Sequence, residues 1–122
     1  RAIFEGVACM LRENMELIEE VNHIQVGEIR SLGGGAQSAV WQQIKADVSK
    51  KPIGALAEPE CSSLGVAILS AVALGYYASA EAAAALANKV TDWRQPDAAQ
   101  FALYDQLYEK YSALYDRLEP LF

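Results

Sequence analysis

Three consecutive glycines, Gly33 to Gly35, are the residues whose type and spacing most directly suggest chemistry. They follow a short β-prone segment and precede a run with helical periodicity. Glycine costs backbone entropy wherever it lies, so three together indicate either a sharp bend or a backbone that another group approaches closely. The second alternative is a binding site.

The helix expected to begin at Ala36 gives the second alternative a chemical meaning. Its first turn would present unpaired backbone N–H groups and the positive end of the helix dipole, which favour an anionic ligand such as phosphate. The stretch GGGAQS is neither a G-x-G-x-x-G motif nor a Walker A loop, because no Lys-Ser or Lys-Thr pair ends it. Taken alone, the glycines leave open whether they bind an anion or only form a turn.

The other reactive side chains do not form a recognisable catalytic or metal-binding set. Asp47, Asp92 and Asp97 are expected to be solvated or to cap helices, and His23 to lie in an exposed loop. The same solvated role is expected for the acidic face of the first helix, formed by Glu13, Glu16, Glu19 and Glu20. Cys9 and Cys61 lack the spacing of a zinc site or a disulfide framework.

Composition limits the class of protein. The 122 residues are 52% hydrophobic, with a mean hydropathy of +0.06, which is typical of one packed domain or part of one. A net charge of −6 argues against a nucleic-acid partner. The longest apolar run, 66–77, is too short to span a membrane, and the free cysteines fit a reducing cytoplasm. Because the chain starts at Arg1 inside a helical pattern, we expect a fragment of a longer protein.

The elements that must position the glycines alternate between helix and strand. Periodicity predicts helices over 1–20, 36–49, 62–74, 79–88 and from about 101 to 118, and strands over 26–32 and 52–56. The segment 91–99 is predicted to be a connection rich in turn residues. This order indicates an α/β fold, in which ligands gather where loops leave the carboxyl ends of strands. The glycines follow such an end.

Two features of the predicted helices bear on packing. The small residues of 62–74 and the alanines of 79–88 predict close contact with neighbouring elements. The last helix carries a stripe at alternating spacings of three and four, made of Phe101, Tyr104, Tyr108, Tyr111, Tyr115 and Leu118. This stripe is expected to dock onto the core, because no basic neighbours support stacking on nucleic-acid bases.

Four segments, in this order, resemble the carboxyl-terminal part of FGGY-family carbohydrate kinases, most closely the branch that phosphorylates D-xylulose. They are RAIFEGVACMLRENMELIEE, IRSLGGGAQSAVWQQIKADVSKKPI, SSLGVAILSAVALGYY and YDQLYEKYSALYDRLEPLF. The resemblance covers residues 1–122 and implies a helix-rich α/β fold, the carboxyl-terminal part of an actin-like, ribonuclease-H-like ATPase domain. It also implies ATP with magnesium as cofactors, ATP/ADP and a sugar as partners, a cytoplasmic enzyme, and the option of a homodimer.

Carried over residue by residue, the resemblance assigns nucleotide binding to Gly34, Gly35 and Ala36, with Ser38 either contacting the nucleotide or capping its helix, capping being slightly favoured. Ala39 stands where some branches of the family have an Asn that reaches the adenine, so base recognition would rest on packing and backbone contacts. The family's catalytic Asp and sugar-binding residues are expected upstream of Arg1. The isolated chain is therefore expected to be inactive.

Two alternatives stay open at this point. The sugar could be gluconate, ribulose or glycerol, since no residue of this chain is expected to touch it. The chain could also be a non-enzymatic helical interaction module, with the tyrosine-rich helix as its partner surface. A strand before Gly33 in a parallel sheet would count against the interaction module.

Overall fold

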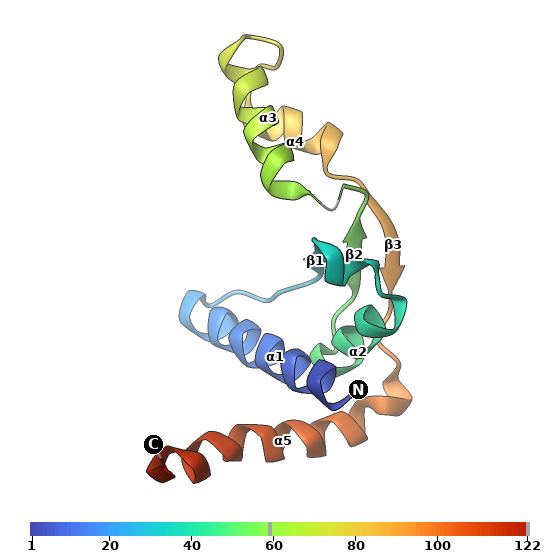
Figure 1. The fold of residues 1–122 in the computed structure, drawn as a ribbon, viewed down its shortest axis with the longest axis vertical. Coiled ribbons are helices and arrows are strands. Elements are labelled where there is room, and N and C mark those ends of the chain that lie inside the picture. Colours follow the sequence, from blue (N-terminus) through green and yellow to red (C-terminus); the bar gives the residue numbers. More distant parts are fainter. Residues whose placement is uncertain (59, 122) are drawn as a thin grey trace.

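The computed structural model describes residues 1–58 and 60–121, without the side chain of Tyr115, so that Pro59 and Phe122 lie outside the described residues. A small sheet lies in the middle of an elongated molecule (Figure 1). Three helices occupy one end: α1 (Ala2–Asn22), α2 (Ala39–Ser49) and α5 (Phe101–Leu118). A helical hairpin of α3 (Cys61–Ala73) and α4 (Ala80–Ala87) projects from the other end.

The sheet has the strand order β1-β2-β3, formed by Ile29–Ser31, Ile53–Leu56 and Val90–Arg94. β1 and β2 are parallel, with Ile29 opposite Ile53, and α2 is the crossover helix that such a pair requires. β3 is antiparallel to β2. The predicted α/β organisation is confirmed.

β3 corrects the prediction that 91–99 is only a connection. Its residues pair with β2 from Arg94, opposite Ile53, to Val90, opposite Leu56. None of its five side chains is buried. An exposed edge strand needs no apolar alternation, so the sequence carried little signal for it.

β1 is shorter than the predicted strand 26–32. The Val26 N–H donates to the carboxylate of Glu19 at 2.7 Å, which diverts it from a strand ladder. The ladder begins only where Ile29 N–H donates to Pro52 O at 2.9 Å. The connection from α1 is therefore held by a side chain instead of by the sheet.

The core lies between α1, α2 and α5. Its buried members are Ala8, Cys9, Ile44, Val48 and Tyr104, and Leu107, Tyr108 and Tyr111 pack against them. The prediction that the stripe of α5 docks onto the core is confirmed for Tyr104, Tyr108 and Tyr111. It is wrong for Leu118, which is 38% exposed, and the side chain of Tyr115 lies outside the described residues.

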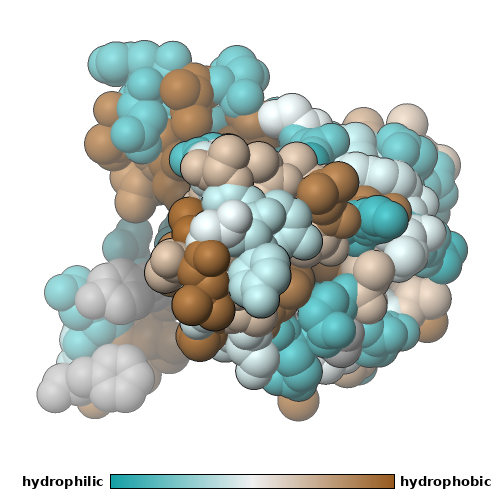
Figure 2. Space-filling view, turned by 90° about the horizontal axis from the view of Figure 1, so that it is seen from above, coloured by the Kyte–Doolittle hydropathy of each residue, from teal (hydrophilic) through white to brown (hydrophobic). Residues whose placement is uncertain are grey.

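The hairpin packs much less closely than its small residues predicted. α3 contains no buried residue, and α4 buries only Ala83. Val66 and Leu69 are 66% and 63% exposed. Seen from the hairpin end in Figure 2, hydrophobic residues lie at the surface among polar ones. The tight packing predicted from the alanines of 79–88 is therefore wrong for this chain, although α3 and α4 contact each other.

Candidate functional site

The glycine turn, residues 32–38, leaves the carboxyl end of β1. Gly33 has φ 78° and ψ −176°, a conformation that side-chain-bearing residues rarely adopt. Gly34–Gln37 then form a 3-10 turn, whose first hydrogen bond runs from Ala36 N–H to Gly33 O at 3.0 Å. A sharp bend therefore explains the glycine at position 33.

Close approach by another group explains Gly35. A Cβ added there would overlap Cζ3 of Trp41 and lie 3.0 Å from its Cε3. The group that needs the space is thus an indole ring from the first turn of α2. The resemblance assigned Gly35 to nucleotide binding, and the structure places Trp41 beside it.

Gly34 is different from both of its neighbours. Its φ is not positive, it is exposed, and an added Cβ would meet nothing within 4 Å. The described residues therefore give no steric reason for glycine at this position.

The helix after the turn begins later than predicted. α2 starts at Ala39, because the 3-10 turn and the extended Ser38 (φ −88°, ψ 106°) come first. The Ser38 hydroxyl accepts a hydrogen bond from Trp41 N–H at 3.4 Å, so the capping role that the sequence favoured is confirmed. Ala36 is only 5% exposed. Because α2 starts at Ala39, the positive end of its dipole lies at the end of the turn that is farther from β1.

Trp41 and Lys45, one helical turn apart on α2, lie against the glycine turn and against the end of β1 that precedes it. The Lys45 ammonium donates to Ser31 Oγ at 3.2 Å and lies 4.4 Å from the centroid of the Trp41 ring. Burial lowers the pKa of Lys45. Phe4 of α1 stacks on Trp41 with a centroid distance of 4.9 Å. The sequence analysis did not single out Lys45, although its i+4 spacing from Trp41 was a usable signal.

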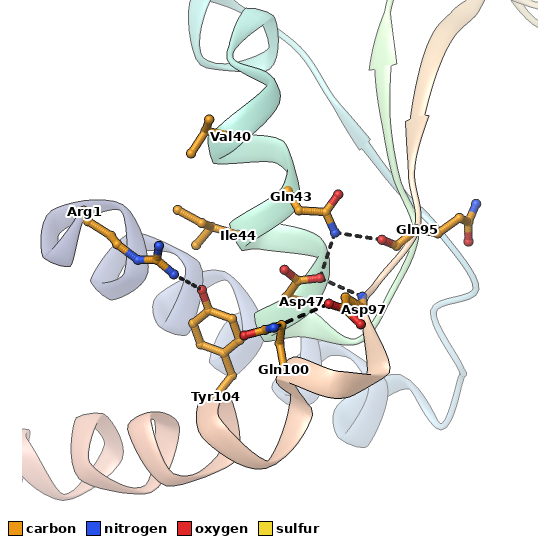
Figure 3. Close-up of a pocket in the computed structure, with 9 residues that line it drawn as sticks. All are labelled: Arg1, Val40, Gln43, Ile44, Asp47, Gln95, Asp97, Gln100 and Tyr104. Atoms are coloured by element: carbon orange, nitrogen blue, oxygen red, sulfur yellow. Dashed lines mark hydrogen bonds between the residues drawn. The ribbon is translucent and has the colours of Figure 1, made fainter.

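A second polar cluster lies where the chain passes from β3 to α5 (Figure 3). Asp47, only 5% exposed, accepts hydrogen bonds from Gln43 Nε2 at 2.8 Å and from Asp97 N–H at 2.7 Å. Gln43 Nε2 also donates to Gln95 O at 2.8 Å. Of the two roles expected for Asp47, solvation is therefore wrong, and its contacts are those of a cap on the connection. The cluster borders an open cavity of about 670 Å³ that Arg1 and Tyr104 also line.

Asp97 and Asp92, which belong to the same part of the chain, act locally. Asp97 accepts from Ala99 N–H at 3.0 Å, and Asp92 pairs with Arg94 at 2.7 Å. In the described part of the chain, no group of three or more His, Cys, Asp or Glu side chains is placed to hold a metal ion. Within residues 1–58 and 60–121, no helix combines the length and apolarity that crossing a membrane requires.

Comparison with known proteins identifies relatives over the whole chain. The model of the "FGGY family of carbohydrate kinases, C-terminal domain" matches residues 1–74. A xylulose kinase from Staphylococcus epidermidis is 33% identical over 121 residues, which are 99% of this chain and 24% of that protein. L-fuculokinase from Escherichia coli K12 is 27% identical over 122 residues, which are 100% of this chain and 22% of that protein.

A solved structure agrees with these matches. The crystal structure of xylulose kinase from Rhodospirillum rubrum superimposes with a TM-score of 0.82 at 33% identity, covering 99% of this chain and 24% of that one. The chain thus spans about a quarter of the length of the curated relatives it matches. The family match over residues 1–74 includes β1, the glycine turn and α2.

Proposed function

The chain belongs to the FGGY family of carbohydrate kinases, and we propose that the complete protein transfers the γ-phosphoryl group of ATP to D-xylulose, forming D-xylulose 5-phosphate. The choice of sugar is supported by the xylulose kinases from S. epidermidis and R. rubrum, each 33% identical to this chain. The chain has the fold of the carboxyl-terminal part of an actin-like, ribonuclease-H-like domain.

Residues 1–122 would form the carboxyl-terminal portion of the nucleotide-binding domain. In this proposal the turn that carries Gly34, Gly35, Ala36 and Ser38 forms part of the nucleotide-binding wall, with Gly34 as its exposed member. The observation that carries it is Gly34, an exposed glycine at the carboxyl end of a parallel strand with no steric reason of its own. A bare backbone at this position would let the phosphates or ribose of ATP approach, as ligands do at such ends in α/β sheets.

This chain would bind and orient the nucleotide and leave the proton transfer to residues elsewhere in the protein. Phosphoryl transfer needs a base for the sugar hydroxyl and stabilisation of charge on the phosphates. Asp47, Asp92 and Asp97 are held in caps and an ion pair, and among the described residues no group of three or more His, Cys, Asp or Glu side chains is placed to hold a metal ion. We therefore assign magnesium to the phosphates of bound ATP and to no site within this chain.

The test is Gly34→Ala in the complete protein, because this substitution meets no atom of the chain itself. Losing one backbone contact to a charged phosphate costs ~1.5–3 kcal/mol, so the apparent constant for ATP should rise about ten- to hundredfold. The constant for the sugar and the melting temperature should stay unchanged. A variant whose ATP constant equals that of the wild type would refute the proposed nucleotide contact.

L-Fuculose is the second candidate substrate, because the E. coli L-fuculokinase matches all of this chain at 27% identity. Gluconate, ribulose and glycerol complete the panel left open by the sequence. Comparing the kcat/KM of the complete protein for D-xylulose and these four compounds decides among them. The parallel pairing of β1 with β2 counts against a non-enzymatic helical module. A cytoplasmic location, a homodimer and inactivity of the isolated chain stay predictions.

A further inference from the structure

We propose that Trp41 is a positioning residue for the nucleotide, and that Gly35 is glycine because it must accommodate this indole ring. The inference rests on the proposed contact between the glycine turn and ATP. It changes the role of one residue in that turn: Gly34 would face the ligand, whereas Gly35 would face the protein. Trp41 would then set how far the backbone at Gly34 extends toward the nucleotide.

The indole is held from several sides. Phe4 of α1 stacks on it at 4.9 Å with an interplanar angle of 23°, and the Lys45 ammonium lies 4.4 Å from its centroid. Its Nε1 is buried and has no hydrogen-bond partner among the described residues. Packing therefore fixes the ring, and any atom added at Gly35 must displace either the stack or the turn.

The turn itself is short and held on both sides, by Lys45 at Ser31 and by the Ser38 cap at the start of α2, so a displacement at Gly35 reaches Gly34. Lys45 holds Ser31 at the end of β1 through the 3.2 Å hydrogen bond. Ala36 N–H closes the turn onto Gly33 O at 3.0 Å. Gly34 lies inside this closed loop, one peptide bond from the residue that rests on the ring. Moving Gly35 away from Trp41 thus moves the backbone that the ligand would contact.

The experiment is a double-mutant cycle in the complete protein, with Gly35→Ala, Trp41→Phe and the pair combined. A phenyl ring is shorter than an indole and lacks Cζ3 and Cη2, two of the three atoms closest to the added Cβ. Trp41→Phe keeps an aromatic ring for Phe4 to stack on and breaks no hydrogen bond of the described residues. The readouts are the apparent constants for ATP and for the sugar, kcat, and the melting temperature.

Gly35→Ala alone should raise the ATP constant about tenfold, equivalent to ~1.4 kcal/mol, without changing the sugar constant. In the Trp41→Phe background the same substitution should change the ATP constant by less than about twofold, because the space is free and the coupling is lost. Two results overturn the proposal. One is an equal effect of Gly35→Ala in both backgrounds, which would mean direct contact with the nucleotide. The other is a lower melting temperature with an unchanged ATP constant, which would mean that the added methyl group displaces the Trp41 ring and leaves the glycine turn in place.

Gly54→Ala is the matched control. A Cβ at Gly54 would lie 2.8 Å from Cγ1 of Val90 and 2.9 Å from Cζ3 of Trp93, so it also crowds a glycine against an indole, but within the sheet. It should lower the melting temperature and leave the ATP constant unchanged. Gly34→Ala tests the proposed nucleotide contact separately from the role of Trp41. An unchanged ATP constant in the Gly34→Ala variant would refute that contact, whatever the double-mutant cycle shows.

Discussion

The three-helix end of the molecule and the α3–α4 hairpin differ in how well the rest of the chain buries their apolar side chains. The three helices α1, α2 and α5 enclose a core in which Val48 is fully buried and Tyr104 is 2% exposed. α3 has a more apolar sequence and buries no residue. A helix that is apolar all round is normally covered by other elements. Hydrophobic periodicity thus identifies helices in both regions, but only in the first does the chain supply the surface that they pack against.

Polar contacts follow the same division. Arg12 of α1 binds Glu16 at 2.7 Å and Asp105 of α5 at 2.9 Å, and its guanidinium lies 4.2 Å from the ring centroid of Tyr108. Asp105 also binds Lys50 at the end of α2. In the described part of the hairpin no ion pair joins α3 to α4. The three-helix end is therefore held by packing and by a charge network that links all three helices.

The comparison predicts a large difference between two apolar truncations. Ile44→Ala removes a side chain that is 5% exposed and should cost ~2–5 kcal/mol of unfolding free energy. Leu69→Ala, in a side chain that is 63% exposed, should change it by less than about 0.5 kcal/mol. Urea unfolding of the 122-residue chain measures both. Equal losses would show that the hairpin and the three-helix core unfold as one unit with a shared core.

The pH dependence of stability should reveal the contribution of Tyr108 to the three-helix end. Its hydroxyl donates to Glu16 Oε2 at 2.8 Å, and partial burial together with that carboxylate raises the pKa of Tyr108 from 10.0 to about 12. Between these values the folded state keeps a proton that the unfolded state has released. The contribution of Tyr108 is thus complete below pH 10.0 and is lost as the pH rises toward about 12.

The matched variant is Tyr108→Phe, which has no proton to lose. Its unfolding free energy should fall less steeply than that of the wild type across this alkaline window, while the other tyrosines contribute equally to both proteins. Parallel alkaline unfolding curves would contradict the assignment.

The sequence predicted the features that depend on local patterns, and it missed an exposed strand and a contact set by the exact path of a turn. Helix positions, the strands β1 and β2 of an α/β fold, the docking of Tyr104 and the capping by Ser38 all followed from local pattern, because capping and periodicity are local properties. The edge strand β3 was missed, since it buries no side chain. The contact between Gly35 and Trp41 could not be predicted, because it depends on where a 3-10 turn places one backbone atom against a ring six residues later.

Two serine caps give the smallest and most direct test of the comparison, since the chemistry is the same in both regions. Ser38 Oγ accepts from Trp41 N–H at 3.4 Å at the start of α2, and Ser79 Oγ accepts from Ala82 N–H at 3.2 Å at the start of α4. Replacing an N-cap serine by alanine costs about 1 kcal/mol of helix stability.

In α2, which supplies Ile44 and Val48 to the core, Ser38→Ala should lower the global unfolding free energy by about this amount. In α4, which buries only Ala83, Ser79→Ala should leave the global value unchanged and accelerate amide hydrogen exchange in the hairpin alone. Hydrogen exchange of both variants resolves the two cases. Faster exchange throughout α2 in the Ser79→Ala variant would mean that the hairpin is coupled to the core after all, and the division between the two regions would fail.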